Sequence, residues 1–232
     1  LHASDLQHND AMRLEWDRLN ADRADLPFLS AHAIGIALDV FGEGRERLVI
    51  ARNSDSVVAM FVLVPKGKLR WQTFQPSQVP LGAWVAQANM TLTALAASLI
   101  EGPLGPCLVL SITQVDPRFA PPEADSPDSV RSDYIDTGWI DVEGSFEQYW
   151  NGRGKNLRQN MRKQRSKLAG EGTRTCIKVW VEPDQMAPAL ARYGVLEGAG
   201  WKAARGTAIR PDNEQGRFYT RLFEDAARRG EG

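Results

Sequence analysis

Basic side chains are concentrated between Ser145 and Gly170, in the stretch SFEQYWNGRGKNLRQNMRKQRSKLAG, and they are the first candidates for chemistry. Arg158, Arg162 and Arg165 recur at close to helical spacing, and other basic residues surround them: Arg153, Lys155, Lys163 and Lys167. Like charges four residues apart on a helix repel each other, and little acid lies nearby to offset them. The stretch therefore fits two interpretations. One is a solvated basic face of a surface helix, and the other is a platform for an anion such as a nucleotide phosphate or an acidic polymer.

Two helices separated by a glycine break should position these charges. Ser145 followed by Gln148 three residues later is a capping box, which predicts that a helix begins there. Gly152 and Gly154 each cost a helix roughly 1 kcal/mol relative to alanine, so we expect the break between them. A longer helix should follow as far as Gly170. One apolar seam along the stretch, opposite the arginines, consists of Trp150, Leu157, Met161 and Leu168.

Two further pairs of residues have side chains suited to substrate binding or catalysis. Trp201 and Lys202 follow a pair of glycines; a tryptophan ring stacks on a sugar or a base, and a lysine attracts an anion. The alternative for this pair is a hydrophobic anchor beside a surface lysine. Asp133 and Tyr134 lie on the segment before the basic stretch, where they would serve as general base and general acid unless their role is structural.

Several other kinds of site have no support in the sequence. The three histidines lie in the first helical segments without complementary Cys or carboxylate ligands, so we expect no metal site. No Gly-x-Ser-x-Gly elbow and no P-loop is present. Cys107 and Cys176 form no CxxC motif, and two reduced thiols in a cytoplasmic protein are the simplest account, although one disulfide stays open. Three arginines of the first helix are scattered among acidic residues and are typical of a solvated surface: Arg13, Arg18 and Arg23.

The composition is that of an ordinary globular protein. The chain has 232 residues, of which 43% are hydrophobic and 25% charged, enough for one large or two small domains. Its formal net charge of −1 argues against a general nucleic-acid coat, because acid elsewhere balances the basic stretch. No window approaches the length and apolarity of a membrane span. The start at Leu1 rather than methionine weakens any argument from the lack of a signal peptide.

The first half should fold into an α/β structure of the α+β layered type. A helix over about 10–23, with Leu14 and Leu19 inward, and a helix capped by Ser30 come first. Turn signals then separate three strands of an antiparallel meander, expected at 46–52, 56–64 and 68–74. A largely buried helix over about 83–100 and a fully buried strand over 107–112 should follow.

The second half is short of strands. Strands are expected over 131–142 and 175–181, on either side of the basic stretch, with later helices over about 184–194 and 213–229. Since so few strands cannot make a two-sided sheet, this half must share the sheet of the first half or lack its remainder.

Several motifs occur together in an order that is known from one family. The motifs are Leu26-Pro27-Phe28, Phe41-Gly42, Pro80-Leu81-Gly82, the basic block from Gly152 through Met161 to Gly170, Trp201-Lys202 with Gly206, and Arg217-Phe218-Tyr219. With these motifs the sequence resembles the bacterial GNAT-type acyltransferases of cellulose and exopolysaccharide biosynthesis, which are relatives of the FemAB aminoacyltransferases.

The resemblance implies two GNAT-like lobes in tandem, each a mixed sheet flanked by helices. The first lobe would span residues 1–143, and residues 144–232 would hold the basic linking helix and an incomplete second lobe. The activity that it implies is transfer of an acyl group from acetyl-CoA or another acyl-CoA to an amine or hydroxyl on a sugar or cell-envelope precursor. Arg158 and Arg162 would contact the cofactor phosphates, and Trp201 with Lys202 would contact the acceptor.

One departure from the family pattern concerns the cofactor. GNAT proteins hold the pyrophosphate on backbone amides at a helix N-terminus, with the sequence sign Gln/Arg-x-x-Gly-x-Gly/Ala. Gly198-Ala-Gly200 comes nearest, but Val195 stands where glutamine or arginine should be. We therefore expect an incomplete acyl-CoA site in these residues.

Two alternatives remain beside the acyl-CoA enzyme. A FemAB-like transferase would take its acyl group from aminoacyl-tRNA, which would give the basic helix a phosphate-backbone partner. A non-catalytic binding or scaffold module in polysaccharide assembly would need neither donor.

Overall fold

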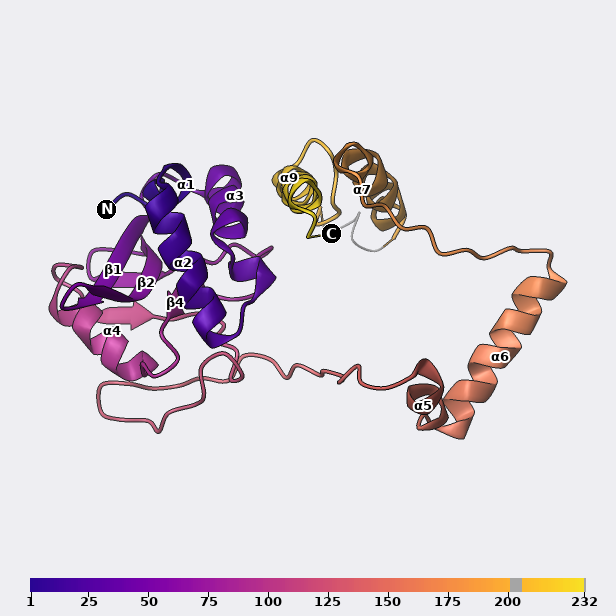
Figure 1. The fold of residues 1–232 in the computed structure, drawn as a ribbon, viewed down its shortest axis with the longest axis horizontal. Helices are drawn as coiled ribbons and strands as arrows, with labels where there is room; N and C mark the ends of the chain where they lie inside the picture. Colours follow the sequence, from indigo (N-terminus) through magenta and orange to yellow (C-terminus); the bar gives the residue numbers. More distant parts are fainter. Residues whose placement is uncertain (201–205, 232) are drawn as a thin grey trace. The chain divides into compact units, whose positions relative to one another are not determined.

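The computed structural model describes residues 1–200 and 206–231, and the chain falls into two compact units (Figure 1). Unit 1 comprises residues 1–132 together with 180–232, and unit 2 comprises residues 133–179. The sequence predicts a different division, between 143 and 144. That division stays a prediction, because compactness alone does not test where an independently folding domain ends.

A five-stranded mixed sheet lies at the centre of unit 1. The central strand, β2, pairs antiparallel with β1 along one edge and with β3 and β4 along the other. The strand β5 pairs parallel with β3. The expected meander is therefore confirmed, as is the α+β layered class with a mixed sheet flanked by helices. The strands are β1 (Arg47–Asn53), β2 (Ser56–Pro65), β3 (Arg70–Thr73), β4 (Trp84–Ala86) and β5 (Val109–Ser111).

Polar side chains mark the starts of three helices of unit 1. Asn9, Ser30 and Asn213 each accept a backbone N–H of the first turn, which satisfies donors that have no partner inside the helix. The helices that they cap are α2 (Asp10–Arg23), α3 (Ala31–Phe41) and α9 (Glu214–Arg229), all close to their predicted positions. The other helices that the structure describes in unit 1 are α1 (Asp5–His8), the 3-10 turn η1 (Pro27–Leu29), α4 (Leu92–Glu101) and α7 (Pro183–Gly198).

The core of unit 1 forms where α2 and α3 pack with β2. Trp16 and Leu19 of α2 are fully buried, and the Trp16 indole donates a hydrogen bond of 2.7 Å to the Leu29 carbonyl. Burial of a large apolar side chain stabilises the fold by about 2 kcal/mol. Leu14, which the sequence predicts to be inward, is 72% exposed, because at 100° per residue it lies on the side of α2 away from Trp16 and Leu19.

The C-terminal helix α9 also belongs to unit 1, where it packs on α3. The Phe41 and Phe218 rings lie 5.3 Å apart between their centroids, and the Arg221 guanidinium reaches the Asp39 carboxylate at 2.5 Å. Phe218 is buried in the same core cluster as Trp16. The α3 surface is thus covered by a segment that lies far away in the sequence.

The prediction of one helix over 83–100 is wrong for the first part of that segment. Residues Trp84–Ala86 form β4, and α4 begins only at Leu92, capped by Thr91. By composition, this apolar run could form a helix or a strand. It forms a strand because it pairs with an edge of β2, where the Trp84 ring stacks on the Phe61 ring with centroids 5.7 Å apart.

Three predicted strands also need correction. The strand expected over 107–112 exists as the shorter β5 and is not fully buried: Val109 is 43% exposed, and Leu108, just before β5, is 75% exposed. The segments 131–142 and 175–181 are strands by pattern, yet neither carries a ladder in the described structure. A strand is stable only beside a partner edge, so alternating side chains alone do not make one.

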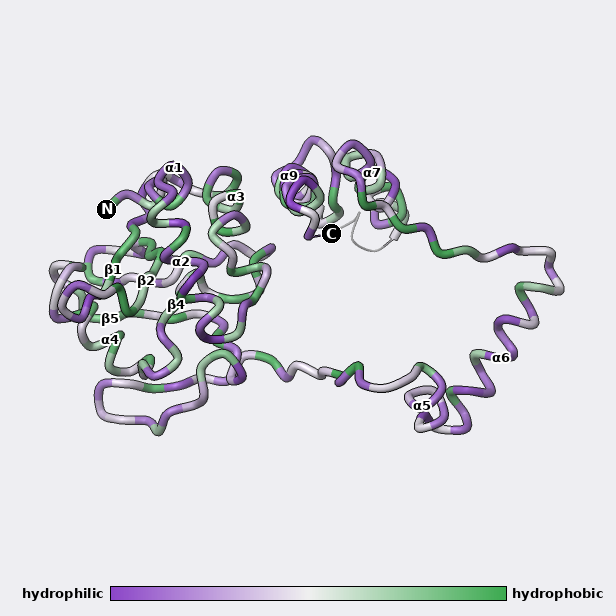
Figure 2. The backbone as a smooth tube through the Cα atoms, in the orientation of Figure 1, coloured by the Kyte–Doolittle hydropathy of each residue, from purple (hydrophilic) through white to green (hydrophobic). Residues whose placement is uncertain are grey.

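Unit 2 contains α5 (Phe146–Asn151) and α6 (Lys155–Gly170). Figure 2 shows that hydrophilic residues dominate α6, with isolated apolar positions along it.

Candidate functional site

The local sequence fixes the two helices of unit 2 as predicted. The Ser145 hydroxyl accepts the Gln148 backbone N–H at 3.2 Å, and the Gln148 side-chain oxygen accepts the Ser145 N–H at 3.0 Å, which is the expected capping box. Gly154 has extended backbone angles, so the helical path is interrupted before Lys155. The glycine break is therefore confirmed.

The cationic helix α6 carries six basic and no acidic residues over its 16 positions. At 1.5 Å per residue it is about 24 Å long, and its charges follow the whole length. None of its residues is buried. Among the described residues, the one ion pair that a side chain of this helix forms joins Lys167 to Glu171, at 3.8 Å. The helix therefore presents a long row of cations with very little internal compensation.

Arg158 and Arg162, the predicted phosphate ligands, lie four residues apart and so on the same side of α6. Arg162 is exposed, whereas Arg158 is half-buried. The Nε atoms of Arg153 and Arg158 are shielded from water and have no hydrogen-bond partner in the part of the chain described. A shielded donor without a partner costs free energy, so both guanidinium groups would gain from turning toward an external acceptor.

Aromatic and apolar side chains accompany these cations. The Phe146 and Trp150 rings of α5 are stacked, with centroids 5.9 Å apart, and Arg153 lies 4.4 Å over the Tyr149 ring. The predicted apolar seam is also uncovered: Leu157 is 48% exposed and Met161 37%. Unit 2 thus combines cations with exposed rings, which are the two kinds of group that bind phosphates and bases.

The candidate catalytic pair, Asp133 and Tyr134, lies in unit 2. Asp133 and Tyr134 lie in an extended segment without helix or ladder, and Tyr134 is 77% exposed. Neither residue lines the pocket beside α2 or the pocket beside β1. Their role as acid and base stays a prediction. Trp201 and Lys202 lie outside the described residues.

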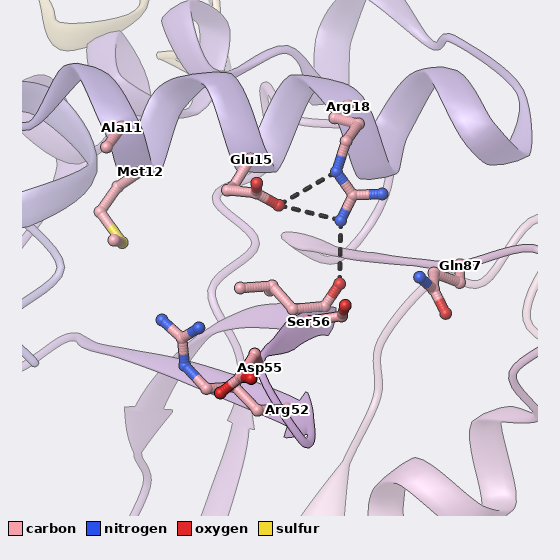
Figure 3. A pocket seen from close by; sticks show the side chains of 9 residues that line it. Ala11, Met12, Glu15, Arg18, Arg52, Asp55, Ser56 and Gln87 are labelled. Atoms are coloured by element: carbon pink, nitrogen blue, oxygen red, sulfur yellow. Dashed lines mark hydrogen bonds and ion pairs between the residues drawn. The ribbon is translucent and has the colours of Figure 1, made fainter.

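A pocket of about 430 Å³ in unit 1 lies between α2 and the turn that joins β1 to β2 (Figure 3). Glu15 and Arg18 form an ion pair of 2.9 Å at its α2 side, and Arg18 also donates to the Val57 carbonyl at 2.9 Å. Arg52 and Asp55 supply a second pair of opposite charges from the turn side. The pocket is therefore polar and electrically mixed, and no sequence motif pointed to it.

Arg23 is a second residue whose role the sequence did not reveal. Instead of lying on a solvated surface, its guanidinium donates to four carbonyls, of Ala86 (3.3 Å), Gln87 (2.7 Å), Met90 (2.8 Å) and Phe119 (3.0 Å). It also lies over the Trp84 ring at 5.3 Å. Burial lowers the pKa of Arg23, while the nearby carboxylates of Asp22 and Glu123 oppose this shift. The arginine is a structural tie between α2 and two later loops.

The N-terminus of α4 is already occupied by an anion of the chain itself. A Glu123 carboxylate oxygen accepts the N–H of Leu92 at 2.7 Å and the N–H of Thr93 at 3.3 Å. These amides are the groups that would hold a phosphate at a helix N-terminus. Since Glu123 satisfies them, α4 offers no free anion site of the kind expected for an acyl-CoA pyrophosphate.

Comparisons with protein-family models, with curated proteins and with solved structures each find no match for this chain. Among the described residues, no group of three or more His, Cys, Asp or Glu side chains is placed to hold a metal ion. Within the same residues, no helix has both the length and the apolar character that a membrane crossing requires.

Proposed function

We propose that this chain serves acyl transfer by binding a polyanionic acyl donor through unit 2, and that the donor is an aminoacyl-tRNA. The observation that carries the proposal is the cationic helix α6, whose six basic residues follow about 24 Å of its length without acidic neighbours on the helix. Phosphodiester backbones are recognised by rows of Arg and Lys of this kind. The acyl-transfer chemistry itself rests on the family resemblance described above.

The geometry favours a long polyanion over acyl-CoA as the donor. The phosphates of one CoA molecule are compact and are best held by backbone amides at a helix N-terminus. In α4 those amides are taken by Glu123, whereas α6 begins at Lys155, after the N-cap residue Gly154, without a side-chain cap and in a stretch of dispersed cations. An extended phosphate backbone could contact many of these cations at once, and an unpaired base could stack on the exposed Phe146 ring, beside the half-buried Trp150.

The remaining parts of the proposal follow from the same family expectation. The acceptor would be an amine or hydroxyl on a small molecule, a saccharide or a cell-envelope precursor. The protein would act in the cytoplasm, where aminoacyl-tRNA is made, and its two cysteines are free thiols in the structure.

Binding of three probes to the full chain tests the donor. Labelled tRNA, acetyl-CoA and a neutral oligosaccharide are titrated separately, with anisotropy for the tRNA and the melting temperature for the other two. We expect tRNA to bind at low salt and to dissociate as salt rises. The variant R158A/R162A should bind tRNA more weakly than the matched variant R70A/R192A, which removes the same charge from exposed positions outside unit 2.

Each other outcome contradicts the proposal in a distinct way. A melting-temperature increase with acetyl-CoA but no tRNA binding would make acyl-CoA the donor. Oligosaccharide binding without either donor would favour a scaffold in polysaccharide assembly. Equal tRNA binding by both double variants would make α6 an ordinary solvated surface helix.

A further inference from the structure

The short helix α5 of unit 2 presents an aromatic surface close to the start of the cationic helix α6, since residues 152–154 are all that separates the two helices (Figure 1). Phe146 is the first residue of α5 and is 63% exposed. Its ring lies nearly parallel to the Trp150 ring, with 5.9 Å between the centroids and 14° between the planes. Trp150 therefore covers one face of the Phe146 ring, and the other face is available to a planar ligand.

Two arginines beside the glycine break complete this corner of unit 2. The Arg153 guanidinium lies 4.4 Å over the Tyr149 ring, which holds it in place and leaves Phe146 as the free platform. Arg153 and Arg158 are both half-buried, and their Nε donors have no acceptor within the described ranges. The corner thus offers one open ring face and two shielded donors, which are the groups that bind one base and its phosphate.

The two kinds of group differ in what they can distinguish. Cations contact the phosphates of a single strand and of a duplex alike, and a duplex carries two phosphate chains over the same length. A protein surface that responded to charge alone would therefore bind a duplex at least as tightly as a single strand. Paired bases inside a duplex are already stacked on both sides, so only an unpaired base can lie on an aromatic ring. Selectivity for single strands must come from Phe146.

We infer that the corner between α5 and α6 makes unit 2 selective for unpaired RNA. An unpaired base stacks on the open face of Phe146, and a neighbouring phosphate accepts hydrogen bonds from Arg153 and Arg158. The rest of α6 contacts the phosphates that follow. This inference rests on the proposed function, because it specifies which part of an RNA donor unit 2 binds.

The test compares three labelled probes by anisotropy on the full chain. They are tRNA, a single-stranded RNA of about twelve nucleotides, and the same strand annealed to its complement. Wild type should bind the single strand more tightly than the duplex at the same salt concentration. F146A should weaken single-strand binding about tenfold and leave duplex binding unchanged, because one stacked base is lost.

Three further variants separate stacking from charge and from structure. F146W should restore single-strand binding, because an indole also stacks on a base. L168A shortens an exposed apolar side chain near the other end of α6 and should bind both RNAs like wild type. The salt dependence of single-strand binding should be the same for F146A as for wild type, whereas R153A should reduce its slope by about one.

The possible failures of this inference and of the donor proposal are distinct. If tRNA binds but F146A loses single-strand and duplex affinity equally, unpaired bases do not stack on Phe146 and the inference is overturned. Tighter binding of the duplex than of the single strand by wild type would overturn it as well. Both results leave the donor proposal standing. No binding of any of the three RNAs at low salt would overturn the donor proposal, and this inference with it.

Discussion

At the scale of single residues, Arg23 shows how a charged side chain stabilises unit 1 through backbone acceptors rather than through a carboxylate. Its guanidinium donates to carbonyls at the end of β4 and in the loop that follows, and to the Phe119 carbonyl, which is far away in the sequence. The five fixed N–H donors of arginine allow this, whereas a lysine offers one nitrogen. The resulting contacts hold the segments on either side of α4 against α2.

We expect R23A to lower the free energy of unfolding by about 3 kcal/mol, because the carbonyls that it leaves without donors are partly shielded from water. R23K should fall between R23A and wild type. Urea denaturation monitored by circular dichroism measures this loss, with R70A as the control for removal of an exposed arginine. An R23A midpoint equal to that of R70A would contradict this role.

The sequence could predict contacts between neighbouring residues but not contacts between residues that are far apart in the chain. The capping box of Ser145 and Gln148 is local, so three residues of sequence suffice to find it. The partners of Arg23 lie more than sixty positions away, and nothing in the order of residues along α2 distinguishes Arg23 from Arg13. The same is true of Arg18, whose carbonyl partner is on β2.

At the scale of elements, the glycine break sets where α6 begins and so where its row of cations starts. Gly152 already has helical backbone angles, whereas Gly154 is extended. An added Cβ at Gly154 would meet no atom within 4 Å. The break therefore rests on the weak helix propensity of glycine rather than on packing.

The variant G152A/G154A should extend α6 backward toward α5, since each alanine favours the helix by roughly 1 kcal/mol relative to glycine. Helical Cα chemical shifts at positions 153 and 154 measure the change, and G138A, at an exposed position outside a helix, is the control. Unchanged shifts at both positions would mean that another interaction maintains the break.

Elements defined by local signals were predictable, and elements that depend on a partner were not. The hairpins of β1, β2 and β3 have turn residues between apolar runs, and the helix starts have caps. The β4 segment became a strand because β2 offered an edge, whereas 131–142 and 175–181 have the pattern of strands and meet no edge in the described structure. The same difference applies to the candidate site. The basic residues of α6 could be found in the sequence, whereas the contact of the Glu123 carboxylate with the N-terminus of α4 could not.

At the scale of the whole molecule, the chain leaves unit 1, forms unit 2 and returns to add α9 to α3. The two connecting segments, 133–144 and 171–182, have no helix and no ladder that the structure describes. Their apolar residues are exposed: Ile135, Trp139, Ile140, Val142, Ile177 and Val179. Backbone of this kind is the part of a native protein that proteases reach first.

Thermolysin, which cuts before large apolar residues, should therefore cleave first within these two segments. The fragments of unit 1 should persist and stay associated through the α3–α9 contact, including the Phe41 and Phe218 rings. Mass spectrometry of a time course, followed by size-exclusion chromatography, checks both statements. Early cleavage inside β2 would contradict the division into two units.

The most direct test of polyanion binding by α6 is the salt dependence of tRNA affinity. For wild type, the logarithm of the binding constant should fall linearly with the logarithm of salt concentration, with a slope set by the number of neutralised phosphates. R158A/R162A should reduce the steepness of that slope by about two, one for each lost phosphate contact, and R70A/R192A should leave it unchanged. Equal slopes for all three proteins, or no binding even at low salt, would contradict the account.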